Sequence, residues 1–340
     1  MTILKVIAAI TAALAVILVV SYWSAGHSRL LLDDTIRARL QAEGHAHNFI
    51  TLTDGTVHYR LEGPQDAPLV VLIHGFSLPS FIWDPYIEPL IRSGYRVLVY
   101  DNYGRGFSDR PAGPYNADLF DRQLDELLGA LAPDAQVDLL GYSMGGAIAT
   151  IFSARHPKQV RSLILMAPAG LGMSNNNQSE WITKPLIGDW FIRLFGLKLF
   201  HDRAADAAKS TENPANFLAR SDRQMEFRHY GDALLSTLRH FPLTGAEKEY
   251  AETGTSSRPV MVIWGEADNT VPFSNAKRLM ELMPHAKLYS FPKIGHEIGT
   301  AKPDLVIKLL IDFLNAHHDK QQGSEPPAFR VQPRVQPTAN

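Results

Sequence analysis

A short motif that places a serine between two glycines constrains this chain more than any other feature. The Gly-x-Ser-x-Gly pattern at residues 141–145 follows an apolar run and precedes a helical pattern that ends before Pro157. A serine in a strand-to-helix turn is exposed at a helix N-terminus, where free N–H groups favour developing negative charge. The glycines are needed because side chains there would collide with neighbouring elements. The motif therefore predicts a nucleophile at Ser143.

Apolar runs alternate with amphipathic helical patterns along most of the chain. Residues 49–52 and 57–61 flank Asp54-Gly55, a pair typical of a tight hairpin turn. Later runs lack polar alternation, as expected of strands covered on both faces. The order of elements predicts an α/β fold with a mostly parallel central sheet and helices on both faces. Further strands are predicted at residues 69–73, 96–100, 137–140, 163–166, 260–264 and 287–291, and helices at residues 81–93, 118–131, 146–155 and 304–317.

The alternation breaks between Pro168 and Arg258, where helical patterns occur without a convincing strand. Apolar residues from Ile187 to Phe195 are spaced to form one face of a helix. We therefore expect a helical cap inserted between two halves of one sheet. The predicted organisation is an N-terminal transmembrane anchor or signal peptide (1–26), a linker (27–47), a core (48–168 and 258–317), the cap (169–257) and a disordered tail (318–340).

The N-terminus is apolar enough to interact with a membrane. Residues 6–23 form an apolar run that is just long enough to cross a bilayer as a helix, and Tyr22 and Trp23 suit the interface at its end. The rival interpretation is a secretory signal peptide with Lys5 as a minimal basic region. We expect a single-pass membrane anchor, with a secreted or periplasmic protein as the alternative. Residues 30–44 read as an amphipathic linker helix.

Composition excludes several classes of site. The 340 residues include no cysteine, which rules out disulfides, thiolate metal sites and a cysteine nucleophile. A formal net charge of −2 gives no sign of a nucleic-acid partner. The Gly104-Arg105-Gly106 sequence lacks the helix and third glycine of a dinucleotide-binding fingerprint. We expect no cofactor and no metal, while the oligomeric state is left open.

A serine hydroxyl is a weak nucleophile until a base takes its proton. His296 lies in a loop after the last predicted strand and suits that role. Its imidazole in turn needs a carboxylate to fix the tautomer. Asp268, just past a strand end, is the preferred candidate. Its rivals are Glu266, Asp101 and Glu297, of which Asp101 precedes a glycine-rich stretch that indicates a structural turn.

Acyl transfer also needs hydrogen-bond donors aimed at the developing oxyanion. The backbone N–H of Met144 is one candidate, because it follows the nucleophile directly. The second is the N–H of Phe76, in the sequence His74-Gly75-Phe76 after a predicted strand. We expect His74 to hold that loop rather than to act as a second base.

Five motifs occur in an order that resembles the α/β-hydrolase superfamily. They are the His-Gly-Phe loop at 74–76, the Asp-x-x-Gly-x-Gly-x-Ser stretch at 101–108, the serine turn at 141–145, the Gly-x-x-Asp at 265–268 and the Gly-His at 295–296. The resemblance spans roughly residues 48–317 and is similar to membrane-anchored monoacylglycerol lipases and related esterases. It implies a triad of Ser143, Asp268 and His296, an acyl-enzyme intermediate and no cofactor.

Other members of that superfamily remain as alternatives. Ser143 argues against epoxide hydrolases and haloalkane dehalogenases, which carry aspartate at this position. Carbon–carbon bond hydrolases usually have asparagine where Tyr142 stands, whereas haloperoxidases and perhydrolases have a very similar serine turn. A non-catalytic binding protein is a further possibility. We expect cleavage of lipid-like acyl esters, because the cap carries more apolar surface than its own core needs and the anchor would hold the domain near lipid. The alternative is that the cap aromatics only pack the cap onto the sheet. These aromatics are Trp181, Trp190, Phe191, Phe195 and Phe200.

Overall fold

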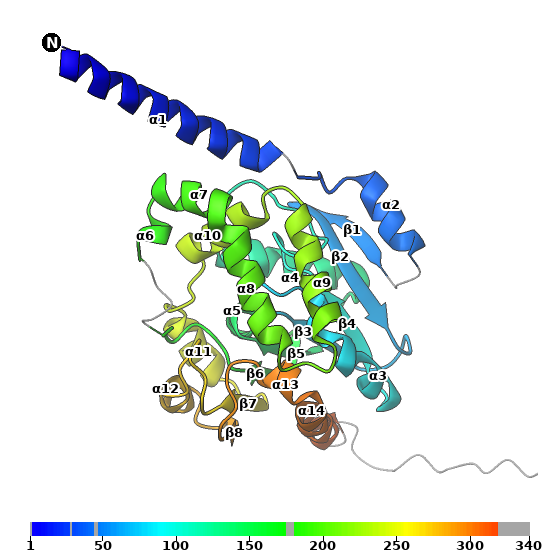
Figure 1. The fold of residues 1–340 in the computed structure, drawn as a ribbon. Helices are drawn as coiled ribbons and strands as arrows, with labels where there is room; N and C mark the ends of the chain where they lie inside the picture. Colours follow the sequence, from blue (N-terminus) through cyan, green and yellow to red (C-terminus); the bar gives the residue numbers. More distant parts are fainter. Residues whose placement is uncertain (1, 28, 44–46, 175–179, 319–340) are drawn as a thin grey trace, which may run out of the picture.

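An eight-stranded sheet forms the centre of the protein in the computed structural model, which describes residues 2–27, 29–43, 47–174 and 180–318 (Figure 1). The strand order is β1-β2-β4-β3-β5-β6-β7-β8. The β1–β2 and β2–β4 pairs are antiparallel, and every other pair is parallel. The strands are β1 (Asn48–Leu52), β2 (Gly55–Glu62), β3 (Leu69–Ile73), β4 (Arg96–Tyr100), β5 (Val137–Tyr142), β6 (Val160–Met166), β7 (Val260–Gly265) and β8 (Lys287–Phe291).

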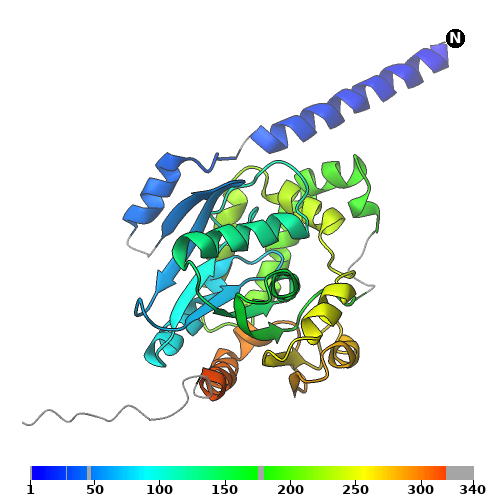
Figure 2. The same cartoon turned by 180° about the vertical axis from the view of Figure 1, so that it is seen from behind.

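Helices cover both faces of the sheet, which buries the central strands completely. Helices α3 (Asp84–Arg92) and α14 (Pro303–His318) pack together on one face. Helices α4 (Ala117–Leu131), α5 (Met144–Arg155), α11 (Glu247–Gly254) and α12 (Asn275–Leu282) cover the other (Figure 2). Every residue of β3, β5 and β7 is buried, which explains their unbroken apolar pattern. The predicted α/β-hydrolase architecture is confirmed.

A helical segment separates β6 from β7, where the strand pattern breaks in the sequence. Its helices pack partly on one another through a small apolar cluster that includes Phe200 and Tyr230. Two of them, α8 (Leu197–Ala208) and α9 (Pro214–Arg223), lie side by side in front of the sheet (Figure 1). Besides α11, the segment contains α6 (Glu180–Thr183), α7 (Ile187–Phe191), the π-helical turn η3 (Ile192–Gly196), α8 (Leu197–Ala208), α9 (Pro214–Arg223), the short 3₁₀ turn η4 (Gln224–Glu226) and α10 (Tyr230–His240).

The apolar face predicted between Ile187 and Phe195 is not a buried stripe. The side chain of Ile187 is 59% exposed and that of Phe195 is 49% exposed. The π-helical turn at η3 interrupts the 3.6-residue period on which the prediction rested. The spacing therefore predicted which residues are apolar neighbours but not that part of this surface is exposed.

The N-terminal helix α1 (Thr2–His27) extends away from the body of the protein (Figure 1). Among the described residues, it is the one helix long and apolar enough to cross a membrane, over Ile3–Ser24. Its length and composition suit either an anchor or a signal sequence. The following linker helix, α2 (Asp34–Ala42), is shorter than predicted because Asp33 caps it and Leu30 pairs with Phe227 in an isolated bridge.

Smaller elements complete the chain. The 3₁₀ turn η1 (Ser80–Trp83) precedes α3 and forms the first part of the helix predicted at 81–93. Helix α12 and the short α13 (Ile298–Ala301) were not predicted. The predicted disordered tail lies almost entirely outside the described residues, which end at His318, the last residue of α14.

Candidate active site

The turn between β5 and α5 has the geometry that its glycines imply. Ser143 has a φ of 55°, a left-handed conformation that is uncommon for a residue other than glycine. A Cβ at Gly145 would lie 2.2 Å from the carbonyl oxygen of Ile73, and a Cβ at Gly141 would lie 2.2 Å from that of Gly145. Side chains at these positions would displace backbone. The glycines therefore allow β3, β5 and α5 to approach closely beneath the serine.

His296 bridges Ser143 and Asp268. The imidazole Nδ1 donates to Oδ2 of Asp268 at 2.8 Å, and Nε2 lies 3.0 Å from Oγ of Ser143. Oδ1 of Asp268 accepts hydrogen bonds from the backbone N–H groups of Thr270 and Val271, which fix the carboxylate. With Nδ1 protonated, Nε2 is the ring atom that can take the serine proton. The structure thus brings together the three side chains predicted from the sequence.

The loop that carries His296 is held by a contact that the sequence did not suggest. The Tyr142 hydroxyl donates to the backbone carbonyl of His296 at 2.8 Å, and the two rings lie 5.2 Å apart. Burial raises the pKa of Tyr142 well above its usual range, which keeps the hydroxyl protonated as a donor. The residue before the nucleophile therefore positions the base.

Two of the three rival carboxylates have other partners, and the third, Glu297, lines the cavity beside His296. Asp101 is buried and accepts hydrogen bonds from the N–H groups of Ser80 and Phe107 and from Nδ1 of His58. Burial alone would raise the pKa of Asp101, but the adjacent His58 imidazole brings it well below its usual range. Glu266 accepts from the Ser290 hydroxyl. Asp101 thus fastens the turn after β4, as its sequence context indicated.

The loop after β3 brings Phe76 close to the nucleophile. A Cβ at Gly75 would lie 3.2 Å from Cβ of Ser143, so this backbone passes directly beside the serine. His74 holds the loop, because its Nε2 accepts from the N–H of Asn102 and its Nδ1 donates to the Gly75 carbonyl. Burial lowers the pKa of His74 to about 4, which keeps this imidazole neutral. Its structural role matches the expectation from sequence.

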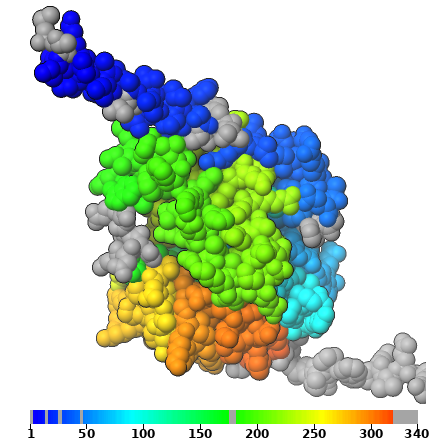
Figure 3. Space-filling view, viewed as in Figure 1, coloured from blue at the N-terminus to red at the C-terminus, as the bar shows by residue number. Residues whose placement is uncertain are grey.

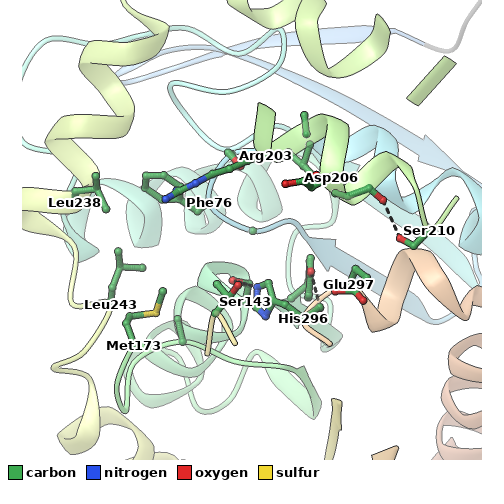
Figure 4. A pocket seen from close by; sticks show the side chains of 18 of the residues that line it. Phe76, Ser143, Met173, Arg203, Asp206, Ser210, Leu238, Leu243, His296 and Glu297 are labelled. Carbon is green, nitrogen blue, oxygen red and sulfur yellow. Dashed lines mark hydrogen bonds between the residues drawn. The ribbon is translucent and has the colours of Figure 1, made fainter. Parts of the chain in front are cut away.

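A cavity of about 670 Å³ opens above Ser143 and His296 (Figure 4). Its two ends differ in polarity. The side chains of Met173, Leu238 and Leu243 lie together at one end, which we call the apolar arm. Across the serine from this arm lie Asp206, Ser210 and Glu297, which we call the polar end. The site can therefore hold a molecule that is apolar on one side of the reacting bond and polar on the other.

Helix α8 contributes one cation to the roof of this cavity. The Arg203 side chain extends from α8 beside Phe76, on the opposite side of the cavity from Ser143 (Figure 4). Partial burial lowers its pKa. In the part of the chain that the structure describes, no carboxylate pairs with its guanidinium, whereas Lys209 pairs with Asp206 at 2.6 Å. The sequence pattern did not predict a role for Arg203, because its place in the cavity depends on how α8 packs over the sheet.

The cap aromatics do not form an acyl pocket, contrary to the expectation from the sequence. Phe200 is buried against Phe76 and Tyr230. Trp181, Trp190, Phe191 and Phe195 are not among the residues that line the cavity, and they contact one another instead. The apolar lining comes instead from Leu238 and Leu243 in and after α10, from Met173 after β6, from Ala204 and Ala207 of α8 and from Phe76 and Leu78 after β3. Aromatic content thus misidentified the residues of the pocket.

A family model for the α/β hydrolase fold matches residues 68–302, more than half of the chain. The chain belongs to the α/β-hydrolase fold family. A 2-hydroxy-6-oxononadienedioate/2-hydroxy-6-oxononatrienedioate hydrolase of Cupriavidus pinatubonensis is 27% identical over 302 residues, covering 82% of this chain and 99% of the relative. A bifunctional esterase/perhydrolase of Acinetobacter calcoaceticus is 23% identical over 278 residues, covering 79% of this chain and 99% of the relative.

Among solved structures, a membrane phospholipase A has a TM-score of 0.65 at 21% identity, covering 93% of this chain and 99% of its own. This is a likeness of fold. The family match and the curated relatives identify the protein as a hydrolase of this family. The relatives support carbon–carbon bond or esterase/perhydrolase chemistry, the alternative from the sequence, better than they support cleavage of lipid esters.

Proposed function

We propose that the protein is a serine hydrolase that cleaves carboxylic esters with an apolar acyl group. The observation that carries this proposal is the 3.0 Å contact between His296 and Ser143 at the base of a cavity with an apolar arm. Ser143 Oγ attacks the ester carbon while its proton passes to Nε2 of His296. The N–H groups of Phe76 and Met144 stabilise the oxyanion.

Collapse of this tetrahedral intermediate breaks the bond to the alcohol, which leaves with the proton held on His296. An acyl-enzyme remains on Ser143. Water then attacks the acyl carbon, again giving its proton to His296, and collapse returns that proton to Ser143 and releases the carboxylic acid. Asp268 stays ionised throughout and stabilises the imidazolium. These steps require no group beyond the chain and water.

The polarity of the cavity supports one orientation of the ester. The apolar arm, lined by Met173, Leu238 and Leu243, would take the acyl chain. The polar end, with Asp206, Ser210 and Glu297, would take a hydroxylated alcohol. A monoacylglycerol has this distribution of polarity and is the substrate type that we propose.

Hydrolysis of p-nitrophenyl esters from acetate to octanoate by the full chain in lipid nanodiscs, followed by a monoacylglycerol assay, tests this proposal. We expect octanoate to exceed acetate at least about tenfold in kcat/KM, because each buried methylene contributes roughly 0.8 kcal/mol. A flat profile, or acetate as the best ester, would contradict an acyl-binding arm.

Hydrolysis of a carbon–carbon bond is the second candidate, and two observations favour it. The name of the Cupriavidus relative denotes dicarboxylate substrates. Arg203 places a guanidinium in the cavity roof with no carboxylate partner among the described residues. If this candidate is correct, Arg203→Gln should abolish turnover of a 2-hydroxy-6-oxo-dienoate and spare neutral esters. Faster turnover of the dienoate than of any ester by the unmodified protein would replace the ester proposal.

We also propose that α1 remains as a single-pass membrane anchor. None of the described side chains in its 22-residue apolar segment Ile3–Ser24 is buried, and the segment ends near Tyr22 and Trp23. The full-length protein should then stay with membranes after high-salt and carbonate washes, and its mass should include the N-terminal residues. A mature N-terminus near His27 would instead identify a signal peptide and a secreted or periplasmic protein.

A further inference from the structure

The outer side of the cap carries a group of exposed apolar side chains that the proposed reaction does not use. Leu186 is 83% exposed, Ile187 59%, Phe195 49% and Trp181 43%. We call these four residues the cap rim. Trp181 and Phe195 are connected through Phe191, whose ring centre lies 4.7 Å from that of Trp181 and 5.4 Å from that of Phe195. Leu186 and Ile187 begin the helix that ends at Phe191. Contiguous apolar surface of this kind marks an interaction site.

Two of the three charged residues in this segment, Asp189 and Arg193, pair with residues of the cap, whereas Lys184 is exposed. Asp189 pairs with Arg239 at 2.7 Å, and Arg193 pairs with Asp232 at 3.1 Å. Both partners come from α10, so these charges are turned toward the body of the protein. The surface around the cap rim is therefore apolar apart from Lys184, whose long side chain can keep its ammonium at the lipid headgroups.

The backbone at Leu186 holds this side chain outward. Leu186 has φ 67° and ψ −55°, and the N–H of Ile187 donates to the carbonyl of Pro185 at 2.8 Å, which closes a tight γ-turn. The N–H of Leu186 also donates to Asp189. A left-handed conformation is unfavourable for a leucine. An exposed leucine that is held in this unfavourable conformation indicates that the outward position of its side chain has a function.

The cap rim adjoins the end of α1. The Arg193 guanidinium lies 4.1 Å from the centre of the Tyr22 ring, a cation–π contact between η3 and the last turns of the apolar helix. The end of α1 contacts η3, and Figure 3 shows α1 next to the cap. If α1 crosses the bilayer, Tyr22 lies at the membrane interface. The contact with Arg193 then brings the cap rim to the same depth.

From these contacts we propose that the cap rim inserts into the bilayer interface beside α1 and forms a second membrane contact of the protein. This inference rests on the proposed retention of α1 as an anchor. A lipid surface is the occupant that the contact with Tyr22 favours, because it places the patch at the membrane rather than facing a second copy. Helix α8, which lines the cavity, follows η3 directly. The proposal therefore puts the roof of the cavity next to the lipid.

Because the chain has no cysteine, a single Leu186→Cys substitution can carry an environment-sensitive fluorophore in the full-length protein. Leu305→Cys is the matched control, since Leu305 is also an exposed leucine but lies on α14, far from α1 (Figure 1). In phosphatidylcholine–phosphatidylglycerol vesicles containing doxyl-labelled lipid, we expect a blue shift and quenching at position 186 and neither at position 305.

Equal signals at the two positions would overturn the proposal. A blue shift at position 186 without lipid quenching, which grows with protein concentration, would identify a second copy of the chain and overturn it as well. Failure of the protein to float with vesicles would instead refute the anchor, so the two failures are distinguishable.

A kinetic readout is independent of the label. Leu186→Asp should lower hydrolysis of esters embedded in vesicles by about tenfold, the factor for losing burial of roughly one apolar side chain. Its rate on a water-dissolved ester should not change, because Leu186 does not line the cavity. Leu305→Asp should change neither rate. An equal loss on both substrates, or no loss on vesicles, would contradict insertion of the cap rim.

Discussion

The Nε2 atom of His296 lies 3.0 Å from Oγ of Ser143, although 153 positions separate the two residues along the chain. The fold makes this contact by ending β5 in a glycine-flanked turn and by closing the loop after β8 over it through Tyr142. Because the imidazole is already oriented by Asp268, the serine can transfer its proton without rearrangement of the site.

Ser143→Ala should abolish turnover while the protein remains folded. Removal of the hydroxyl eliminates the acyl-enzyme route, and the loss of kcat should approach about a millionfold, as for the corresponding change in subtilisin. A fluorophosphonate probe should label the unmodified protein and not the variant. Residual activity of even a tenth, in protein free of host esterases, would refute the assignment of the nucleophile. Absence of labelling in the unmodified, folded protein would favour a non-catalytic role.

Two substitutions should distinguish the carboxylate that orients the catalytic base from the one that stabilises the fold: Asp268→Asn and Asp101→Asn. The Asp268 variant should lose about ten-thousandfold in kcat at a nearly unchanged melting temperature, because an amide favours the wrong imidazole tautomer. The Asp101 variant should lose stability, since this carboxylate holds Ser80, Phe107 and His58. Kinetics and thermal unfolding of both variants provide the check. The reverse pattern would identify Asp101 as the acid.

Sequence was sufficient for the core and for the proposed triad because both follow from local patterns. Gly141 and Gly145 are compatible with few backbone conformations of the serine turn, and Asp268 and His296 each lie in the loop after a predicted strand. The residues that form the roof of the cavity could not be predicted from the sequence, because Arg203 and Leu238 come together only when α8 and α10 pack in the folded protein. Aromatic residues of the cap were misread for the same reason. Their spacing indicates that they share a surface, but it does not show whether protein or lipid covers that surface.

Gly145→Ala should disrupt the serine turn, and Gly129→Ala is its matched control. A Cβ at Gly145 would meet the carbonyl oxygen of Ile73 at 2.2 Å, whereas a Cβ at Gly129 would meet nothing within 4 Å. We expect the first change to lower the free energy of unfolding by at least about 2 kcal/mol and to abolish activity. Gly129→Ala should raise the free energy of unfolding by about 0.5–1 kcal/mol, because Gly129 lies within α4 and alanine favours a helix more than glycine does. Denaturant unfolding of both variants would measure this, and equal effects would contradict the close approach.

His74 should make stability depend on pH in a defined window. Burial lowers its pKa from the ordinary 6.5 to about 4, so the unfolded chain binds more protons than the folded protein between these values. The contribution of neutral His74 to the free energy of unfolding is complete above pH 6.5. It falls by a total of about 3 kcal/mol as the pH drops toward 4. The destabilisation caused by His74→Gln should therefore be about 3 kcal/mol larger at pH 7 than at pH 4, as measured by denaturant unfolding. A difference that is independent of pH would mean that folding leaves the pKa of His74 at its ordinary value.

Leu238→Trp should shorten the acyl chain that the enzyme prefers. Leu238 lines the apolar arm, and an indole at this position would fill space that the distal methylenes of an octanoyl group would occupy. Six additional methylenes are worth about 4–5 kcal/mol if all are buried, and we expect partial burial. The octanoate-to-acetate ratio of kcat/KM should therefore fall at least about tenfold, with little change in the rate on acetate because Ser143 and His296 are untouched. Tyr289→Trp adds an indole at an exposed position outside the cavity and should leave the ratio as it is. An unchanged ratio in a folded Leu238 variant would mean that the acyl chain does not enter this arm and would remove the structural basis for a lipid-like substrate.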